Sequence, residues 1–298
     1  MPLGKPIMPI FNNQVTLIGE SINDSVPGTK VLLDAGDIAG IQQLAKSQDM
    51  SGADYIDVNI GLRSKDWMTR LVKAIQEVTA KPLSIDSPDI EICRAGLEAY
   101  DADRTGGQRP ILNSISPLRP EMFELLAIKP CLPILLISEQ KTAEGTGIPC
   151  RTAEETHQAA KAMVAMASQH GLGCADVILD PGIAPIGSDT EGNLKRLLGA
   201  MQLIKCDPGL QGVHYSVGLS NFTVMLPIKR KDGVLVKSTL ESAFLTKAVP
   251  LGLDMVIGSV RRNYEPLPES HPAVECLDQC LASEGFDALT HVSRFYRG

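Results

Sequence analysis

The chain has 298 residues, of which 44% are apolar and 21% charged, and its formal net charge is −7. This length and apolar content suffice for a large core, and one α/β barrel of roughly 250 residues with extensions is a reasonable expectation. The negative charge argues against nucleic acid as the main partner, because phosphate binding needs a dense basic surface. No stretch approaches the roughly 20 apolar residues that cross a membrane, and residues 1–13 lack the apolar segment of a signal peptide. We therefore expect a cytoplasmic protein.

Strand-like and helical patterns alternate along the chain. Short apolar runs of about five residues predict strands that are buried on both faces. The expected strands are residues 15–19, 55–59, 82–86, 109–113, 133–137, 176–180, 212–218 and 254–258.

Between these runs, apolar residues recur at helical spacing. Residues 67–78 place Met68, Leu71 and Ile75 on one stripe, and residues 191–204 show a similar stripe. Both patterns predict amphipathic helices that cover a sheet.

Two helix starts are also expected. Ser87 followed by Pro88 is typical of an N-cap with proline at the first helical position. Thr152 with Glu155 has the spacing of a capping box.

Eight strands that alternate with helices favour a closed (β/α)8 TIM barrel over an open doubly wound sheet. The open sheet would be expected to carry a glycine-rich phosphate signature at the start of a helix, and the sequence has neither a dinucleotide fingerprint nor a P-loop. We expect one domain over residues 1–298, with an N-terminal extension at 1–14 and a C-terminal helical segment at 262–298.

The seven cysteines are scattered and odd in number, so reduced thiols are expected. Cys276 and Cys280 share a helical spacing, but no nearby His or Cys completes a zinc set. No metal site is predicted.

Polar side chains stand where the expected strands end. In a parallel barrel all these ends meet at one mouth, which is where barrel enzymes carry out catalysis. The residues are Glu20, Asp57, Asn59, Asp86, Asn113, Asp180 and Asn221.

These residue types favour a flat heterocyclic ligand. A carboxylate accepts two parallel N–H bonds from an amino-pyrimidinone edge, and an amide both donates and accepts in the same plane. A glycosidase would use paired carboxylates, but aromatic residues for sugar stacking make up only 4% of the chain. A Mg²⁺ site is chemically possible but leaves the Asn residues unexplained. His214, within an expected strand, is more typical of a core residue than of a base.

Six strings resemble, in order, the motifs of the pterin-binding barrels, and most closely the methyltetrahydrofolate:corrinoid/iron-sulfur protein methyltransferases. The folate domain of cobalamin-dependent methionine synthase is a relative of these enzymes. The strings are Gly19-Glu20-Ser21-Ile22-Asn23, Asp57-Val58-Asn59-Ile60-Gly61, Ile85-Asp86-Ser87, Leu112-Asn113-Ser114, Leu179-Asp180-Pro181 and Gly218-Leu219-Ser220-Asn221. The resemblance covers about residues 15–260.

The resemblance implies roles for individual residues. Asp86, Asn113 and Asp180 would hydrogen-bond the pterin ring, with Glu20, Asp57 and Asn59 as further substrate-binding residues. Asn221 would lie beside N5, the nitrogen that carries the methyl group. Gly218 and Ser220 would shape that wall of the pocket.

The resemblance also implies substrates and partners. The enzyme would move a methyl group between a separate corrinoid protein, which carries cobalamin, and N5 of tetrahydrofolate or 5-methyltetrahydrofolate. It would be a homodimer that binds neither nucleic acid nor membrane. Two departures from the motifs stand out, namely Ile115-Ser116 after Asn113 and a long polar loop at 138–151.

The sequence allows more than one role for its two basic runs and more than one function for the barrel. Lys229-Arg230-Lys231 and Arg261-Arg262 are expected to be solvated loops, although either could meet an anionic ligand tail. A dihydropteroate synthase shares the fold, but would be expected to carry Ser-Arg-Lys where Ser220 is followed by Asn221 and Phe222. A pterin-binding protein without catalytic activity is a further alternative. Asp57 and Asp180 could also have purely structural cap or turn roles.

Overall fold

Eight parallel strands form a closed barrel in the computed structural model, which describes residues 14–298. The order around the barrel is β1-β10-β9-β8-β5-β4-β3-β2. The strands are β1 (Thr16–Asn23), β2 (Tyr55–Asn59), β3 (Leu83–Asp86), β4 (Ile111–Ile115), β5 (Leu132–Leu136), β8 (Ile178–Asp180), β9 (His214–Gly218) and β10 (Met255–Gly258).

Each of the eight predicted strands is confirmed, because a run of apolar residues forms a strand that is buried against helices outside and side chains inside. The main difference is β1, which continues to Asn23 and therefore includes Glu20 within the strand. The predicted N-terminal extension lies outside the described residues except for Gln14.

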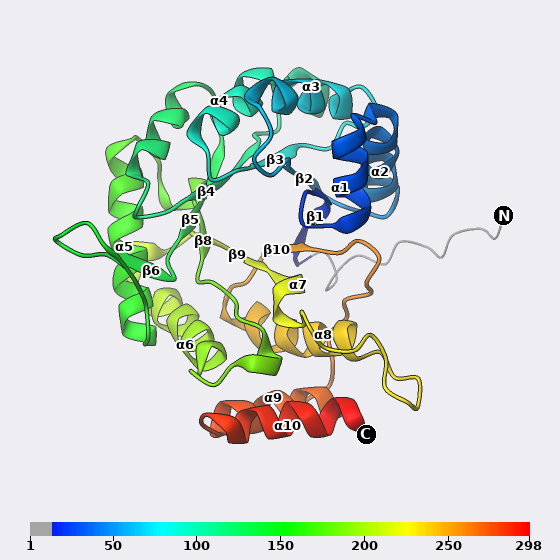
Figure 1. Ribbon diagram of the computed structural model, residues 1–298. Helices are drawn as coiled ribbons and strands as arrows, with labels where there is room; N and C mark the ends of the chain where they lie inside the picture. The colour runs from blue at the N-terminus through cyan, green and yellow to red at the C-terminus, as the bar shows by residue number, and fades with distance from the viewer. Residues whose placement is uncertain (1–13) are drawn as a thin grey trace. The chain divides into compact units, whose positions relative to one another are not determined.

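A helix follows most of the strands along the chain. Figure 1 labels these helices and colours the chain from blue at the N-terminus to red at the C-terminus. A 3-10 helix (Pro120–Ala127) connects β4 to β5. The α-helices are α1 (Pro27–Ala35), α2 (Ile38–Met50), α3 (Lys65–Gln76), α4 (Ile90–Ala99), α5 (Ala153–Gln169), α6 (Asn193–Cys206), α7 (Leu219–Phe222), α8 (Val236–Ala248), α9 (Pro272–Ala282) and α10 (Phe286–Arg297).

The contacts within the chain group its residues into two compact units. The first contains β1 to Asn113 of β4, the segment 124–132 and the segment 258–263. The second contains residues 114–123, 133–257 and 264–298.

Of the two predicted helix N-termini, the one at Thr152 is confirmed and the one at Ser87 is wrong. The capping box is confirmed, since Thr152 Oγ1 accepts from the Glu155 backbone N–H and the Glu155 carboxylate accepts from the Thr152 backbone N–H. The prediction at Ser87 and Pro88 is wrong, because the N-cap of α4 is Asp89, which accepts from two backbone N–H groups of the first turn. Two carboxylate hydrogen bonds satisfy more of the free helix N–H groups than a hydroxyl could.

The polar segment 138–151 is partly ordered as a small antiparallel hairpin, whereas the sequence predicts a loop. Its strands are β6 (Glu139–Lys141) and β7 (Gly147–Pro149). Ser116 donates from Oγ to Glu139 Oε1 over 2.6 Å, which ties the hairpin to the segment after β4. One departure from the family motif, Ser116, therefore has a structural role in the second unit.

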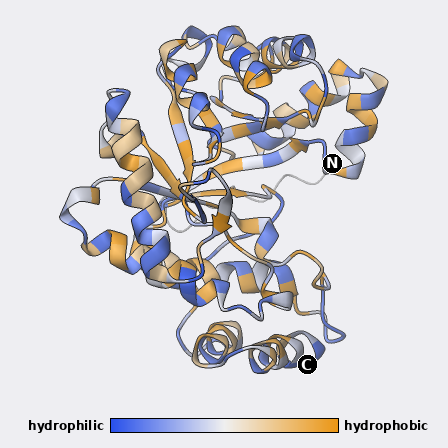
Figure 2. Cartoon of the chain, turned by 60° about the vertical axis from the view of Figure 1, so that its left-hand side comes forward, coloured by the Kyte–Doolittle hydropathy of each residue, from blue (hydrophilic) through white to orange (hydrophobic). Residues whose placement is uncertain are grey.

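The C-terminal helical segment predicted at 262–298 contains α9 and α10, which pack against each other. Cys276 and Cys280 are both buried on α9. Figure 2 shows that the strands are mainly hydrophobic and that the helices carry alternating hydrophobic and hydrophilic stripes. Within residues 14–298, no helix has the length and apolar content needed to span a bilayer.

Candidate functional site

The first unit aligns polar residues in two levels on its neighbouring strands. In the parallel register, Asp57 of β2 pairs with Ser84 of β3, and one level further along Asn59 pairs with Asp86. Asp86 in turn pairs with Asn113 of β4. Because side chains alternate along a strand and paired residues point to the same face, these five side chains share one face of the sheet.

Direct hydrogen bonds join these residues. Ser84 Oγ donates to Asp57 Oδ1 over 2.6 Å, and Asn113 Nδ2 lies 3.5 Å from the same oxygen. Asn59 Nδ2 donates to Asp86 Oδ2 over 2.9 Å. The structure thus brings together the predicted residues Asp57, Asn59, Asp86 and Asn113.

Asp57 is a buried carboxyl group with other acids around it. Its residue surface is 1% exposed. Burial raises the pKa of Asp57 well above its ordinary value, and the negative charges of Asp86 and Glu20 raise it further. Hydrogen bonds from Ser84 and Asn113 oppose this shift; they are smaller effects than burial and the Asp86 charge, but larger than the Glu20 charge. Asp57 therefore holds its proton to a higher pH than an ordinary Asp does. It lies within β2, and the N-cap of α3 is Ser64, so the alternative that Asp57 caps the next helix is wrong.

Glu20 lies beside an irregularity in β1. The pairing of β1 with β2 shifts between Gly19 and Ile22, as in a β-bulge. The backbone of Ser21 in this bulge is satisfied by two side chains, since Gln48 Oε1 accepts from its N–H and Thr29 Oγ1 donates to its carbonyl. This arrangement holds the strand segment that carries Glu20 in a fixed conformation.

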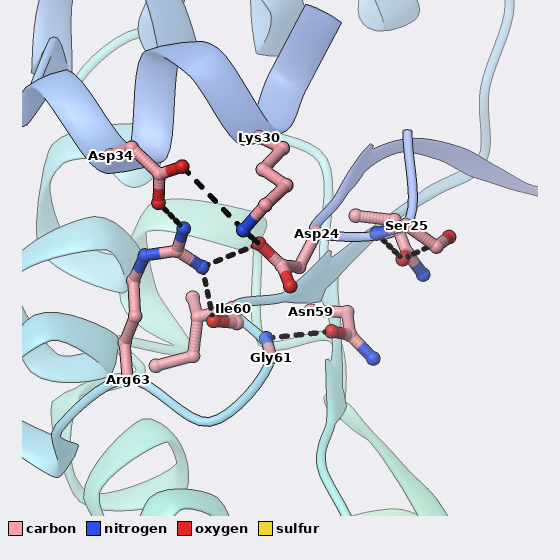
Figure 3. A network of polar contacts seen from close by, with 9 residues as sticks. Asp24, Ser25, Lys30, Asp34, Asn59, Ile60, Gly61 and Arg63 are labelled. Atoms are coloured by element: carbon pink, nitrogen blue, oxygen red, sulfur yellow. Dashed lines mark hydrogen bonds and ion pairs between the residues drawn. The ribbon is translucent and has the colours of Figure 1, made fainter. Parts of the chain in front are cut away.

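Arg63 connects the segments that follow β1 and β2. Its guanidinium donates to Asp24 over 2.6 Å and to the Ile60 carbonyl over 2.7 Å, and it also pairs with Asp34 of α1. Figure 3 shows these contacts beside Asn59, whose Oδ1 accepts from the Gly61 N–H. Sequence reasoning missed Arg63, because its partners Asp24 and Asp34 lie 39 and 29 residues away.

Asp180 in the second unit ends β8 and begins a tight turn. Its Oδ1 accepts from the Gly182 N–H over 2.8 Å, so the turn role expected for Asp180-Pro181-Gly182 is realised. Gly182 has a φ of 69° and approaches Ser138 closely, which excludes a larger residue. Burial raises the pKa of Asp180 to about 6, while the Gly182 N–H and the Arg196 charge act in the opposite direction.

Arg196 of α6 stabilises this turn through hydrogen bonds to its backbone. It is 6% exposed and donates to the carbonyls of Pro181 over 2.8 Å and Gly182 over 3.0 Å, and also to Thr156 Oγ1. A buried arginine retains its charge and can donate several hydrogen bonds in one plane. Arg196 therefore stabilises the turn that carries Asp180, and its charge is the smaller of the two effects that lower the pKa of Asp180, although the sequence shows it only as one residue of an amphipathic helix.

Asn221 lies on α7, the single helical turn that directly follows β9. Its side chain is exposed, and among residues 14–298 its amide makes no hydrogen bond. A Cβ atom at Gly218 would lie 2.8 Å from Asn221 Nδ2, so only glycine leaves room for this amide. Ser220, in the same turn, is half-buried. The second unit thus brings Gly218, Ser220 and Asn221 together.

His214 contacts an acidic side chain, and the basic run at 229–231 is partly exposed. His214 Nδ1 lies 2.6 Å from Asp254 Oδ2 at the start of β9, as an ion pair or hydrogen bond. Lys229 and Lys231 are exposed, whereas Arg230 is half-buried. Within residues 14–298, no group of three or more His, Cys, Asp or Glu side chains is arranged to hold a metal ion.

Comparison with known proteins identifies the family. The pattern of the family described as "Pterin binding enzyme" matches residues 31–258. The chain belongs to this family. The predicted pterin-binding TIM barrel is therefore confirmed.

Relatives with known names agree with this assignment. The chain is 28% identical over 249 residues to the methylcorrinoid:tetrahydrofolate methyltransferase of Eubacterium limosum, covering 81% of this chain and 83% of that protein. Among solved structures, dihydropteroate synthase from Thermus thermophilus is similar with a TM-score of 0.57 and 19% identity, covering 83% and 89% of the two chains. The synthase from Xanthomonas albilineans has a TM-score of 0.53 and 18% identity, covering 82% and 86%. These structures share the fold.

The raised pKa of Asp57 gives a prediction about stability. The unfolded chain loses the Asp57 proton above about pH 3.8, whereas the folded protein keeps it. Stability therefore falls as pH rises above that value, until the folded-state pKa is reached. Asp57→Asn supplies a neutral group of the same shape and removes this pH-dependent loss. We expect thermal melts to show Asp57→Asn to be more stable than wild type at pH 8, with the difference shrinking towards pH 4.

Asp66→Asn is the matched control, because Asp66 is an exposed carboxylate on α3 of the same unit. Its melting temperature should differ little from wild type, and the difference should not grow with pH. A loss of stability in Asp57→Asn that becomes larger towards pH 8 would contradict the protonated state assigned to Asp57.

Proposed function

We propose that this protein transfers a methyl group from a methylated corrinoid protein to N5 of tetrahydrofolate. The named relative supports the reaction and its direction, and membership of a pterin-binding family supports the folate substrate. The geometric observation that carries the proposal is the exposed Asn221 amide, which has no hydrogen bond of its own among residues 14–298 and lies against Gly218, where a Cβ atom would come within 2.8 Å of Nδ2.

In this proposal Asp86, Asn113 and Asp180 hydrogen-bond the pterin ring. An ionised carboxylate accepts from the ring N–H and amino groups, and an amide pairs with the carbonyl and its neighbour. Glu20, Asp57 and Asn59 act as supporting substrate-binding residues. Their support is visible in the first unit, where Asn59 orients Asp86, and Asp57 accepts from Asn113.

Asn221 is the proposed catalytic residue. N5 attacks the methyl carbon, the bond between carbon and cobalt breaks with its electron pair left on cobalt as Co(I), and N5 gains positive charge. The amide oxygen of Asn221 accepts a hydrogen bond from the charged N5–H, which then loses its proton to solvent. In the reverse direction N5 of 5-methyltetrahydrofolate first takes a proton from solvent, and the amide oxygen accepts from the same charged N5–H while Co(I) attacks the methyl carbon. The same contact therefore serves both directions, as microscopic reversibility requires.

Cobalamin enters this scheme as a substrate group carried by another protein. Ser220 and Gly218 are proposed to shape the wall beside N5. We further propose a homodimer located in the cytoplasm, and light scattering at micromolar concentration would test the dimer directly.

The proposed reaction is tested with small molecules alone. The protein is mixed with free methylcobalamin and tetrahydrofolate, and formation of 5-methyltetrahydrofolate and demethylation of the cobalamin are followed together. We expect equal amounts of both products, only with both substrates present, and no loss of folate binding when a chelator is added. A second assay supplies a dihydropterin pyrophosphate and 4-aminobenzoate. Formation of dihydropteroate there, with no methyl transfer in the first assay, would support the synthase alternative instead.

The pKa of Asp180 predicts how folate binding depends on pH. The ionised form is the better acceptor, and with a pKa of about 6 it dominates above that pH. Calorimetry should therefore show affinity for 5-methyltetrahydrofolate falling as pH decreases through about 6 and levelling above it. Asp180→Asn should bind more weakly at pH 7.5 and lack this step. A variant that retains the same step would mean that another group titrates.

Asn221→Ala tests the catalytic assignment. Loss of one preorganised hydrogen-bond partner typically lowers the rate by about 10²–10³-fold. Affinity for folate should change much less, because the interaction is strongest in the transition state. Single-turnover methyl transfer and calorimetry measure the two effects separately. In contrast, Asp180→Ala should lose about 2–5 kcal/mol of binding.

Gly218→Ala tests whether Asn221 needs the space beside it. The added Cβ would displace the Asn221 amide rather than any backbone atom, so the fold should be retained. We expect a slower methyl transfer at nearly unchanged melting temperature. A rate equal to that of wild type would show that the position of the amide is not critical, and an unfolded variant would show that the glycine is needed for the strand itself.

A further inference from the structure

The segment between α7 and α8, residues 223–235, exposes an unusual number of apolar side chains. We refer to it as the 223–235 hairpin. Met225 is 87% exposed and Ile228 is 69% exposed. Large apolar residues that gather at one place on a surface indicate a binding site for another molecule. The exposed apolar residues of the hairpin are Val224, Met225, Ile228, Val234 and Leu235.

The hairpin is held in shape by its own backbone. Lys229 and Leu235 form an antiparallel bridge, and the Arg230 N–H donates to the Val234 carbonyl over 2.9 Å. At its base, the Val236 N–H donates to the Ile228 carbonyl over 2.9 Å. Figure 1 shows the segment in yellow, projecting away from α7 and α8. Its apolar residues are therefore presented on a preformed support.

The three basic residues of the hairpin have different roles. Arg230 lies 5.9 Å from the centre of the Phe295 ring and pairs with Asp232 over 2.7 Å, so it anchors the hairpin within the second unit. Lys229 and Lys231 remain exposed. A rim of two lysines around apolar residues suits a partner with an apolar patch bordered by acidic residues.

Met225 connects the hairpin to the proposed chemistry. It has a φ of 69°, the one positive φ found at a residue other than glycine within residues 14–298. Such a backbone conformation is strained for methionine and is typical of functional sites. Met225 lies four residues after Asn221, and the Val224 N–H donates to the Asn221 carbonyl, so the apolar surface begins at the catalytic turn.

We infer that the 223–235 hairpin is the docking element for the corrinoid-carrying partner protein, with Met225 and Ile228 as its apolar contacts and Lys229 and Lys231 as its charged rim. This inference rests on the proposed function, because a methyl group carried on another protein must be brought to the residue beside N5. The hairpin is continuous with that residue and differs in charge from the chain as a whole, whose net charge is −7.

The test compares a double variant with two methyl donors. Met225→Ser with Ile228→Ser removes both apolar contacts at highly exposed positions, so the fold should not change. The donors are free methylcobalamin and the methylated corrinoid protein of the source organism, purified by its bound cobalamin. We expect kcat/KM for the corrinoid protein to fall by about tenfold or more, while the rate with free methylcobalamin stays within about twofold of wild type.

The matched control is Val31→Ser with Phe286→Ser, which removes apolar side chains that are 67% and 79% exposed on α1 and α10. It should react like wild type with both donors. Lys229→Glu with Lys231→Glu should lower kcat/KM for the corrinoid protein and reverse its dependence on salt, because attraction between the two proteins becomes repulsion, which salt screens.

The outcomes separate the two proposals. Wild-type activity with free methylcobalamin but an unchanged reaction of the Met225 and Ile228 variant with the corrinoid protein would overturn the docking role alone. Equal losses with both donors would overturn it as well, since the residues would then act in the reaction itself. A change from dimer to monomer in light scattering would assign the hairpin to contacts between copies of this chain. A wild type that transfers no methyl group from either donor would overturn the proposed function and the docking role together.

Discussion

The burial of Asp57 among other acids is the constraint on which the polar side of the first unit depends. Its neighbours Glu20 and Asp86 are acids, and the groups that hydrogen-bond it are the neutral donors Ser84 and Asn113. A second buried negative charge at this place would be costly, so Asp57 holds its proton to a higher pH than an ordinary Asp does. Asn59 donates to Asp86, and Asn113 lies within hydrogen-bond distance of Asp57, so these side chains have defined partners.

In the second unit a buried cation, Arg196, acts on the acid Asp180. Arg196 stabilises the turn after β8 through two backbone carbonyls, and its charge counteracts the burial of Asp180. The result is a carboxyl group with a pKa of about 6, which is largely ionised at pH 7. The first unit therefore contains a buried acid of raised pKa within an amide-rich network, and the second contains a carboxyl group that is largely ionised at pH 7.

The fold and the strand-end residues could be predicted because both depend on local sequence. An apolar run of five residues defines a buried strand, and an Asp or Asn at its end marks the mouth of a barrel. Arg63, Gln48 and Arg196 could not be predicted in the same way. Each acts on groups distant in sequence: Arg63 on the side chains of Asp24 and Asp34, and Gln48 and Arg196 on backbone groups. Gln48 and Arg196 also lie in amphipathic helices, where a Gln or an Arg is usually a surface residue. The wrong N-cap at Ser87 has a simpler cause, since two capable residues, Ser87 and Asp89, lie two positions apart and the carboxylate made the stronger cap.

In the proposed site, the carboxyl group of Asp180 affects folate binding and the amide of Asn221 affects the rate of methyl transfer. An amide such as Asn221 does not titrate near neutral pH, so its contribution to the transition state is the same across that range. Asp180 does titrate, and its ionisation governs how well the pterin is held. The pH dependence of the proposed reaction therefore originates in a binding residue, through kcat/KM, whereas the rate of the bound complex depends on the geometry around Gly218 and Asn221. In this proposal the protein needs no titrating catalytic acid in either direction, because the same amide oxygen accepts from the charged N5–H whichever way the methyl group moves.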